Sequence, residues 1–237
     1  MNYKLSCGNE LTLAEAFKLV AEEAELLFCK LGIKLKGFHS PELFLFNELS
    51  SSAQQIALVA AKNFLESYQS DDRDIFDAEK RALWKAFTVF GLVPPSDLLQ
   101  RLIPGRAIEM YTAEGRQIWR NLACLDLCSY TLEEIVSLDV LDRYQRPSFI
   151  EKKCEVEVGA LINGQRSEIF DPRIAVHEAI ETMSDEMYRL SLKHEMFAAL
   201  RDSDGDLRAW LVMTDAHHVG IPVSAPRQVS DHFLELV

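Results

Sequence analysis

Residues 193–213 read KHEMFAALRDSDGDLRAWLVM, which is two apolar runs separated by Asp-Ser-Asp-Gly-Asp. Because Asp and Gly tolerate the positive φ that a tight reversal needs, this pattern predicts a β-hairpin. Alternate residues of each run share one face of their strand: Met196, Ala198 and Leu200 in the first, and Leu207, Ala209, Leu211 and Met213 in the second. We expect this hairpin to be the last pair of strands of an antiparallel sheet in the C-terminal half.

A first pair of strands is expected where the second half begins. The segment 107–112 alternates as a strand, 113–115 (Ala-Glu-Gly) is a turn, and 116–121 returns. After a short apolar stretch, Thr131 and Glu134 form a capping box at the start of a helix. The side chain of each residue accepts a hydrogen bond from the backbone N–H of the other. The sequence therefore predicts a strand pair followed by short helices.

This order of elements resembles a PAS domain. The resemblance rests on Glu109 to Gly115, on Ile118 and Asn121, on the run Ser129-Tyr130-Thr131-Leu132-Glu133-Glu134, and on the hairpin from Glu195 to Trp210. It covers residues 106–216, a little under half of the chain. It implies a sensory or regulatory module whose sheet and flanking helix bind a ligand or a second subunit. The pocket candidates that follow from it are Trp119, Tyr130, His177 and Trp210.

The middle of this region departs from the pattern. The alternation of Cys154–Val158 predicts a strand, Asn163-Gly164 a hairpin turn, and residues 166–170 a return strand. Asp171-Pro172 then predicts the start of a helix that carries His177 and ends near Leu190. Either the chain is a PAS variant with an insertion, or it is a different α+β sheet domain.

The first half has the period of helices. Thr12 and Glu15 form a capping box, and further helices are predicted over 41–49, 51–67 and 76–90 and after Ser96. The first helix carries an apolar stripe that is close to a heptad repeat: Leu13, Phe17, Val20, Ala24, Leu27 and Leu31. This stripe either packs in its own bundle or forms a dimer seam.

Ile103-Pro104-Gly105 is the predicted boundary between the two halves. The fold class that we expect is α+β: a helical domain, 1–104, followed by a PAS-like antiparallel sheet domain with flanking helices, 105–237, which includes a C-terminal tail.

Charge and composition restrict the partners. The net charge is −12; up to Gly105 the chain has 11 Lys and Arg against 14 Asp and Glu, and the remainder has 14 against 23. An acidic second half disfavours direct contact with a phosphate backbone, and no basic cluster in the first half supports DNA binding. The N-terminus lacks the apolar core of a signal peptide, no run is long enough for a membrane helix, and the five cysteines are scattered. We expect a cytoplasmic protein with reduced thiols.

No catalytic residue and no metal ligand can be assigned from the sequence. The run 202–206 lacks the Gly and Glu positions of a calcium loop, so it is interpreted as a turn. Cys124 and Cys128 lack the second pair that a metal site needs and are expected in the core. His177 could bind haem iron only by analogy with some PAS proteins, and adjacent His217 and His218 point to opposite faces of a strand. No cofactor is expected.

The function that the sequence favours is a cytosolic signalling or regulatory protein that acts as a homodimer. A small-molecule ligand or a protein partner would favour one arrangement of the sheet against the N-terminal helices. The alternatives are a transcriptional regulator that contacts DNA through its helical half, an enzyme of unknown class, and a protein-interaction adaptor or effector; an enzyme is the less favoured of these.

Overall fold

The computed structural model describes residues 11–69, 75–184 and 186–220. The N-terminal tail with Cys7 and the predicted C-terminal tail after residue 220 lie outside these ranges. The helices are α1 (Leu13–Lys30), α2 (Phe44–Glu48), α3 (Ser51–Ser67), α4 (Ile75–Val89), α5 (Leu98–Arg101), α6 (Leu122–Leu127), α7 (Leu132–Ser137) and α8 (Ser148–Ile162). The strands are β1 (Ala107–Thr112), β2 (Gln117–Arg120), β3 (Tyr144–Gln145), β4 (Ile169–Phe170), β5 (His177–Glu181), β6 (Arg189–Arg201) and β7 (Leu207–His218).

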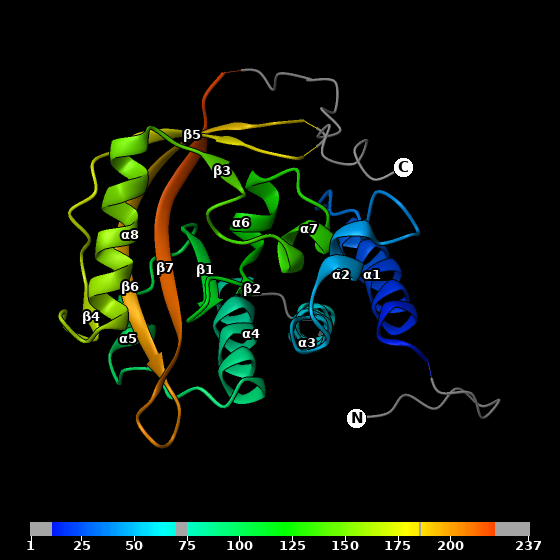
Figure 1. Cartoon of the computed structure of the whole chain (residues 1–237), viewed down its shortest axis with the longest axis horizontal. Helices are drawn as coiled ribbons and strands as arrows, with labels where there is room; N and C mark the ends of the chain where they lie inside the picture. The colour runs from blue at the N-terminus through cyan, green and yellow to red at the C-terminus, as the bar shows by residue number, and fades with distance from the viewer. Residues whose placement is uncertain (1–10, 70–74, 185, 221–237) are drawn as a thin grey trace.

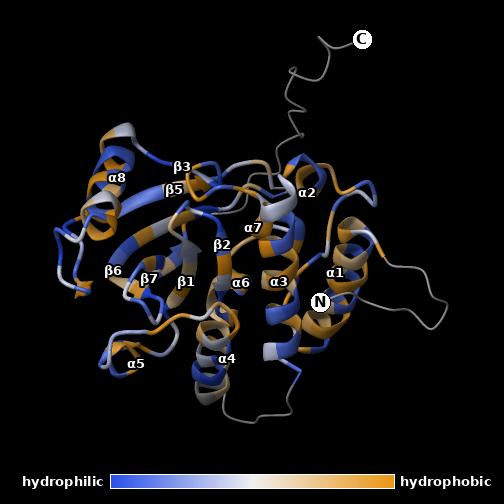
Figure 2. Cartoon of the chain, turned by 60° about the horizontal axis from the view of Figure 1, so that its bottom comes forward, coloured by the Kyte–Doolittle hydropathy of each residue, from blue (hydrophilic) through white to orange (hydrophobic). Residues whose placement is uncertain are grey.

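The N-terminal helices begin where their capping residues predict. The hydroxyl of Thr12 accepts a hydrogen bond from the backbone N of Glu15 at 3.2 Å, and the Glu15 carboxylate accepts one from the backbone N of Thr12 at 2.8 Å. The helices α1 and α3 lie side by side, with hydrophobic residues along both of them (Figure 2). Phe17 of α1 stacks on Phe46 of α2 with ring centres 4.4 Å apart. The predicted helical half is therefore confirmed.

The sheet is antiparallel throughout, in the order β2-β1-β7-β6-β5-β3. The short strand β4 pairs with the part of β6 that β5 leaves free. The first strand, β1, thus lies next to the last strand, β7, within the sheet (Figure 1). The predicted final hairpin is confirmed, and Gly205 at its turn has φ +88°. A bulge in β6 between His194 and Met196 shifts the alternation of faces by one residue, so that His194 and Phe197, whose ring centres are 5.8 Å apart, lie on the same face.

The two faces of the sheet pack against different helices. Met110, Ala198 and Leu211 belong to the main core, which also contains buried residues of α1, α3 and α4. Phe197 and Trp210 lie in a second core with Ile150 and Leu161 of α8. The sheet consequently lies between the N-terminal helices on one side and α8 on the other (Figure 1). The α+β class, with helices first and a flanked antiparallel sheet second, is confirmed.

The predicted hairpin over 154–170 is wrong, because residues 148–162 form the helix α8. Ile150, Cys154 and Leu161 recur at helical spacing and share the inner face, whereas the alternation of Cys154–Val158 is coincidental. Asn163-Gly164 ends the helix instead of reversing a hairpin. Gly164, at φ +68°, donates to Leu161 O, and Gln165 donates to Ala160 O, which is the pair of bonds that closes a Schellman motif.

The predicted helix from Asp171 to Leu190 is also wrong. This segment runs without regular structure into β5, which pairs with β6 and β3. His177, Ala179 and Glu181 are buried, while Glu178 between them is exposed. The inward positions are thus partly polar, so the hydrophobic pattern of the strand was hidden and the spacing of Val176 and Ile180 imitated a helix.

The N-terminal helices are bound to the sheet region through the start of α7. The Glu133 carboxylate accepts a hydrogen bond from the backbone N of Phe46 at 3.1 Å, and Glu134 lies 3.1 Å from His39 Nε2. The backbone N of Leu132 donates to Lys36 O at 2.8 Å. These bonds and the shared main core cross the predicted boundary at 104–105, and the boundary itself stays a prediction.

The heptad-like stripe of α1 is used largely inside the chain. Phe17, Val20 and Ala24 are buried in the main core, and Leu13 and Leu27 pack against it. Leu31 is exposed. The stripe therefore packs in its own bundle, and a partner helix would meet Leu31 together with the exposed Leu19 and Leu26. Dimer formation stays a prediction.

Candidate functional site: a cavity beneath α8

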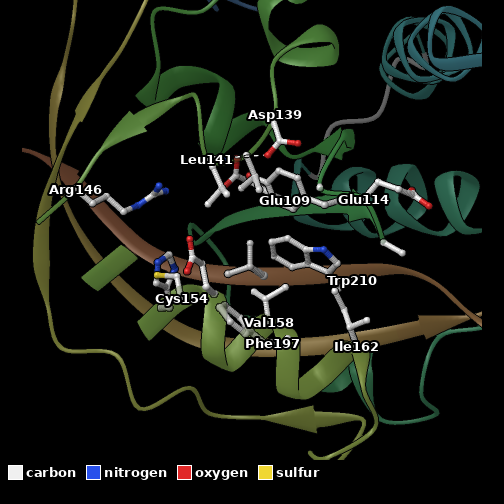
Figure 3. A pocket seen from close by; sticks show the side chains of 18 residues that line it. Glu109, Glu114, Asp139, Leu141, Arg146, Cys154, Val158, Ile162, Phe197 and Trp210 are labelled. Atoms are coloured by element: carbon white, nitrogen blue, oxygen red, sulfur yellow. Dashed lines mark hydrogen bonds between the residues drawn. The ribbon is translucent and has the colours of Figure 1, made fainter. Parts of the chain in front are cut away.

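A cavity of about 350 Å³ lies between α8 and the face of the sheet that α8 covers. The helix contributes Cys154, Val158 and Gly159, and the central strands contribute Phe197 and Trp210 (Figure 3). This volume is within the range of small-molecule sites in proteins, which are typically concave and largely apolar. The fold places the cavity here because α8 rests on the sheet through Ile150 and Leu161 near its two ends.

Aromatic side chains form one wall of the cavity. The rings of Tyr111 and Trp210 stack with centres 4.5 Å apart and planes at 20°, and the Phe197 ring lies 5.9 Å from Trp210. The register of β1, β6 and β7 brings these three residues to one face. The indole N–H of Trp210 is buried and has no hydrogen-bond partner. A bound molecule with an acceptor atom would satisfy this donor.

Arg146 lies at one end of the cavity, directed toward its interior (Figure 3). Its guanidinium carbon lies 5.1 Å from the centre of the Tyr144 ring, and one terminal nitrogen makes a long 3.5 Å contact with Tyr144 O. Its Nε is buried without a partner. No carboxylate of residues 11–69, 78–184 or 186–220 forms an ion pair with it. Arg146 is therefore a cavity-lining cation whose charge is not neutralised by a neighbouring acid.

A buried polar network supports the cavity from below. Glu109, which lines the cavity, accepts hydrogen bonds from Gln117 at 2.7 Å and from Arg120 at 3.2 Å. Arg143 donates to Gln117 at 2.6 Å and to two backbone carbonyls. Burial alone would raise the pKa of Glu109, but Arg120 and Arg143 lower it below the ordinary value. Glu109 is thus ionised, and two buried arginines face this one carboxylate.

The cysteines near this network are thiols. Arg120 Nη1 lies 2.8 Å from Cys128 Sγ, and burial raises the pKa of Cys128 to about 11. Burial likewise raises the pKa of Cys124 and of the cavity-lining Cys154. A thiol with a raised pKa is a poor nucleophile and a poor metal ligand. In the described part of the chain, no three His, Cys, Asp or Glu side chains form a group that could hold a metal ion.

His194 lies at the cavity floor, and His177 lies beside it, outside the lining. His194 lines the cavity, and its Nδ1 is 2.9 Å from the hydroxyl of Thr214. The His177 ring centre lies 5.5 Å from that of His194, and its Nδ1 is 3.0 Å from Ala175 O. Burial lowers the pKa of His177, and it lowers that of His194 to about 3. Both rings are therefore neutral at physiological pH and add no charge to the floor.

Carboxylates occupy the rim of the cavity. Glu114 lies at the end opposite Arg146, and Asp139 lies above the centre (Figure 3). Glu155 on α8 is exposed, as is Glu114. The cavity is consequently polarised, with a cation and a net positive network inside and acids at the solvent edge.

A wider hollow of about 660 Å³ lies between the end of α1 and the edge of the sheet. The polar groups next to it already bond within the chain: Ser129 and the backbone N of Tyr188 donate to Glu181. Since partners are present there and missing beneath α8, the cavity beneath α8 is the better candidate site.

Of the four residues suggested by the PAS resemblance, Trp210 lies in the cavity wall. Trp119 is buried on the opposite face of the sheet, in the main core. Tyr130 lies outside the cavity, where its hydroxyl bonds to Arg143 O and accepts from the backbone N of Thr182. His177 lies behind His194 on β5 and not on a helix.

The sequence reasoning missed Glu109, Arg146 and His194. For Glu109 the sequence predicts only a place in the strand 107–112 and in the PAS resemblance, and the burial of this strand on both faces could not be inferred from alternation. Arg146 precedes α8, in which the alternation of Cys154–Val158 predicts a strand instead of a helix. One signal was available: the spacing of Ile150, Cys154 and Leu161 indicates a helix beside the sheet, and a helix there would enclose a cavity.

Comparisons with known proteins do not identify this chain. No family model matches it, and no curated protein is similar to it. Among solved structures it is similar to a sensory box sensor histidine kinase from Vibrio cholerae, with a TM-score of 0.32 and 11% identity over 60% of this chain and 98% of that one. At this level of similarity the match adds nothing to the geometry. In the described part of the chain, no helix combines the length and apolar character needed to cross a membrane.

Proposed function

We propose that this protein is a PAS-like sensory or regulatory module that binds a small molecule in the cavity beneath α8. The observation that carries the proposal is a cavity of ligand size whose wall holds two buried donors, Trp210 Nε1 and Arg146 Nε, with no partner in the chain. Buried polar groups in folded proteins are almost always hydrogen-bonded, so a ligand or ordered water is expected to complete them. The raised pKa of the cavity-lining Cys154 thiol favours binding over covalent catalysis at this site.

The signal would arise from a shift of α8 against the sheet. The inner side of α8 forms the cavity wall through Cys154 and Val158. The buried carboxylate of Glu157 anchors the helix to Arg166 at 2.7 Å. A ligand that contacts both α8 and the sheet favours the arrangement in which they are closest, which changes the population of helix positions. The N-terminal helices pack on the other face of the same strands, so they are placed to sense such a change.

Native mass spectrometry of the purified protein tests this proposal. We expect an intact mass above that of the denatured chain, due to a small molecule retained from the cells. The variant Val158→Phe should lose that molecule, because the larger ring fills the cavity. Val156→Phe is the matched control: it lies two residues away on the same helix, with Val156 61% exposed, and should retain the molecule.

Two results would count against the proposal. One is a wild-type protein that carries nothing and shows no heat of binding with any member of a metabolite library. The other is a retained molecule that Val158→Phe binds as well as Val156→Phe does, since that molecule would lie elsewhere. Circular dichroism of both variants establishes that each is folded.

A further inference from the structure

We infer that the ligand of this cavity is a small monoanion, such as a monocarboxylate, with an apolar and flat body, whose charged group binds Arg146 and whose body lies along Tyr111, Phe197 and Trp210. The inference rests on the proposed function and specifies the chemical class of its ligand. It is argued from the charges inside the cavity, from the shape of its wall and from the acids at its rim.

The charged side chains in and next to the inner part of the cavity favour an anionic ligand. Glu109 is matched by Arg120 at 3.2 Å, and Arg143 adds a second positive charge whose hydrogen bonds go to neutral acceptors only. Arg146 adds a third, without an ion-pair partner in the described residues. Charges in such surroundings are poorly screened, so an anion that enters gains from all of them. The inner part of the cavity, next to Arg146, Arg120 and Arg143, is therefore locally positive, whereas Glu114, Asp139 and Glu155 line its outer part.

The second step is the choice of the contact atom. The guanidinium of Arg146 presents several N–H groups in one plane, which suits a carboxylate. The guanidinium lies over the Tyr144 ring, with its carbon 5.1 Å from the ring centre, and the buried Nε still lacks an acceptor. Arg120 and Arg143 are fully buried and do not line the cavity, so Arg146 is the cation in the described residues that can touch the ligand directly. A single available cation favours one negative charge over two.

The third step is the body of the ligand. The stacked pair of Tyr111 and Trp210, with Phe197 beside it, offers an extended aromatic surface, and Val158 of α8 faces it across the cavity. Flat apolar groups bury the most area in such a slot. Glu114 and Asp139 at the rim repel an anion there, so the charged end is oriented inward, toward Arg146.

Titration calorimetry with two matched pairs of probes tests the inference: 2-naphthoate against 2-naphthamide, and octanoate against octanamide. Each pair differs in charge and hardly in shape. We expect the carboxylate to bind about ten- to a hundredfold more tightly than its amide, which corresponds to one charge-assisted hydrogen-bonded contact. The naphthyl pair should bind more tightly than the octanoyl pair.

The variants locate the effect. Arg146→Met should remove the preference for the carboxylate and leave the amide affinity within about twofold, and Arg146→Lys should keep part of the preference. Arg189→Met is the control for the loss of one positive charge, since Arg189 is exposed on β6 and lies outside the cavity. It should leave the preference unchanged.

The outcomes separate the two proposals. Equal binding of carboxylates and amides, or a preference that survives in Arg146→Met, overturns the anionic ligand and leaves the binding cavity intact. Absence of binding by all four probes overturns the ligand class. The proposed function falls only if, in addition, the wild-type protein retains no molecule and binds none from the library.

Discussion

His194 is a partly buried neutral base, and its effect on stability has a defined sign. Burial lowers its pKa to about 3 in the folded protein, against about 6.5 in the unfolded chain. Below pH 6.5 the unfolded chain therefore takes up a proton that the folded protein refuses. The stabilising contribution is complete above pH 6.5 and is lost progressively as the pH falls toward 3.

Replacing His194 with Gln removes that proton uptake. Between pH 7 and pH 4.5, the free energy of unfolding of the wild type should fall by on the order of 2 kcal/mol more than that of His194→Gln. The raised pKa values of Glu133 and Glu181 give the opposite slope, but they act in both proteins and cancel in the difference. Urea denaturation at several pH values measures this difference in the free energy of unfolding. Parallel pH profiles of the two proteins would contradict the lowered pKa of His194.

Arg120 forms an ion pair with Glu109, and both side chains are largely shielded from solvent. Arg120→Met leaves a charged carboxylate that keeps Gln117 and Tyr111 as hydrogen-bond partners but loses the cation that contacts it. We expect a loss of about 3 kcal/mol in the free energy of unfolding, as is typical when one partner of a buried ion pair is removed. The double variant Arg120→Met/Glu109→Gln should recover part of this loss, because the unpaired charge is gone. Equal stability of the single and double variants would show that the pair is not coupled.

At the scale of elements, α8 contains a glycine, Gly159, that neither a close contact nor a positive φ requires. Gly159 lies in the helix interior, and a Cβ added there meets nothing within 4 Å. Gly159→Ala should raise the free energy of unfolding by about 0.5–1 kcal/mol, since alanine is the better helix former. Gly164→Ala should have the opposite effect, because Gly164 ends the helix at φ +68°. Thermal unfolding of the two variants checks both signs; a loss of stability in Gly159→Ala would contradict the placement of α8.

Elements with a complete local signal could be predicted from the sequence. Capping boxes at Thr12 and Thr131 mark true helix starts, and the Asp-Gly turn at Gly205 joins true strands. The predictions of elements were wrong where one local pattern is compatible with two structures. Asn163-Gly164 serves a hairpin turn as well as a helix end, and the choice depends on the sheet that α8 covers. In β5, Glu181 is buried because Ser129 and Ser184 donate to it, and such tertiary hydrogen bonds leave no trace in hydropathy.

The cavity could be predicted even less well than the elements. Trp210 could be predicted as a cavity residue because it lies on the second strand of the hairpin that residues 193–213 indicate. Arg146 and Glu109 acquire their roles only when β1 and the segment before α8 meet, and their charges cannot be paired from spacing along the chain. Local sequence indicates which residues are strand or helix, but the neutralisation of each charge is a property of the assembled sheet.

On the scale of the whole molecule, the N-terminal helices and the sheet share the main core. We expect them to unfold together. Phe46 is fully buried, stacks on Phe17, and its backbone N donates to Glu133 of α7. Phe46→Ala should lower the free energy of unfolding by about 3–4 kcal/mol. In a Trp84→Phe background, the fluorescence of Trp119 and Trp210 reports the sheet, and circular dichroism reports mainly the helices.

Both signals should shift to the same lower midpoint in Phe46→Ala. If the helical signal moved and the sheet fluorescence kept its midpoint, the two halves would be independent domains. In that case the proposed route from the sheet to the N-terminal helices would lose its physical basis.

The central claim is that a ligand binds between α8 and the sheet, and the three tryptophans can test it in one titration. Trp210 lines the cavity, Trp119 is buried on the opposite face of the sheet, and Trp84 is exposed on α4. Each gives one indole N–H signal in a two-dimensional ¹H–¹⁵N spectrum, and Trp→Phe variants assign them. On addition of 2-naphthoate, the account predicts that the Trp210 signal moves while those of Trp84 and Trp119 stay in place. A Trp210 signal that stays fixed at saturating probe, or a shift confined to Trp84, would contradict it.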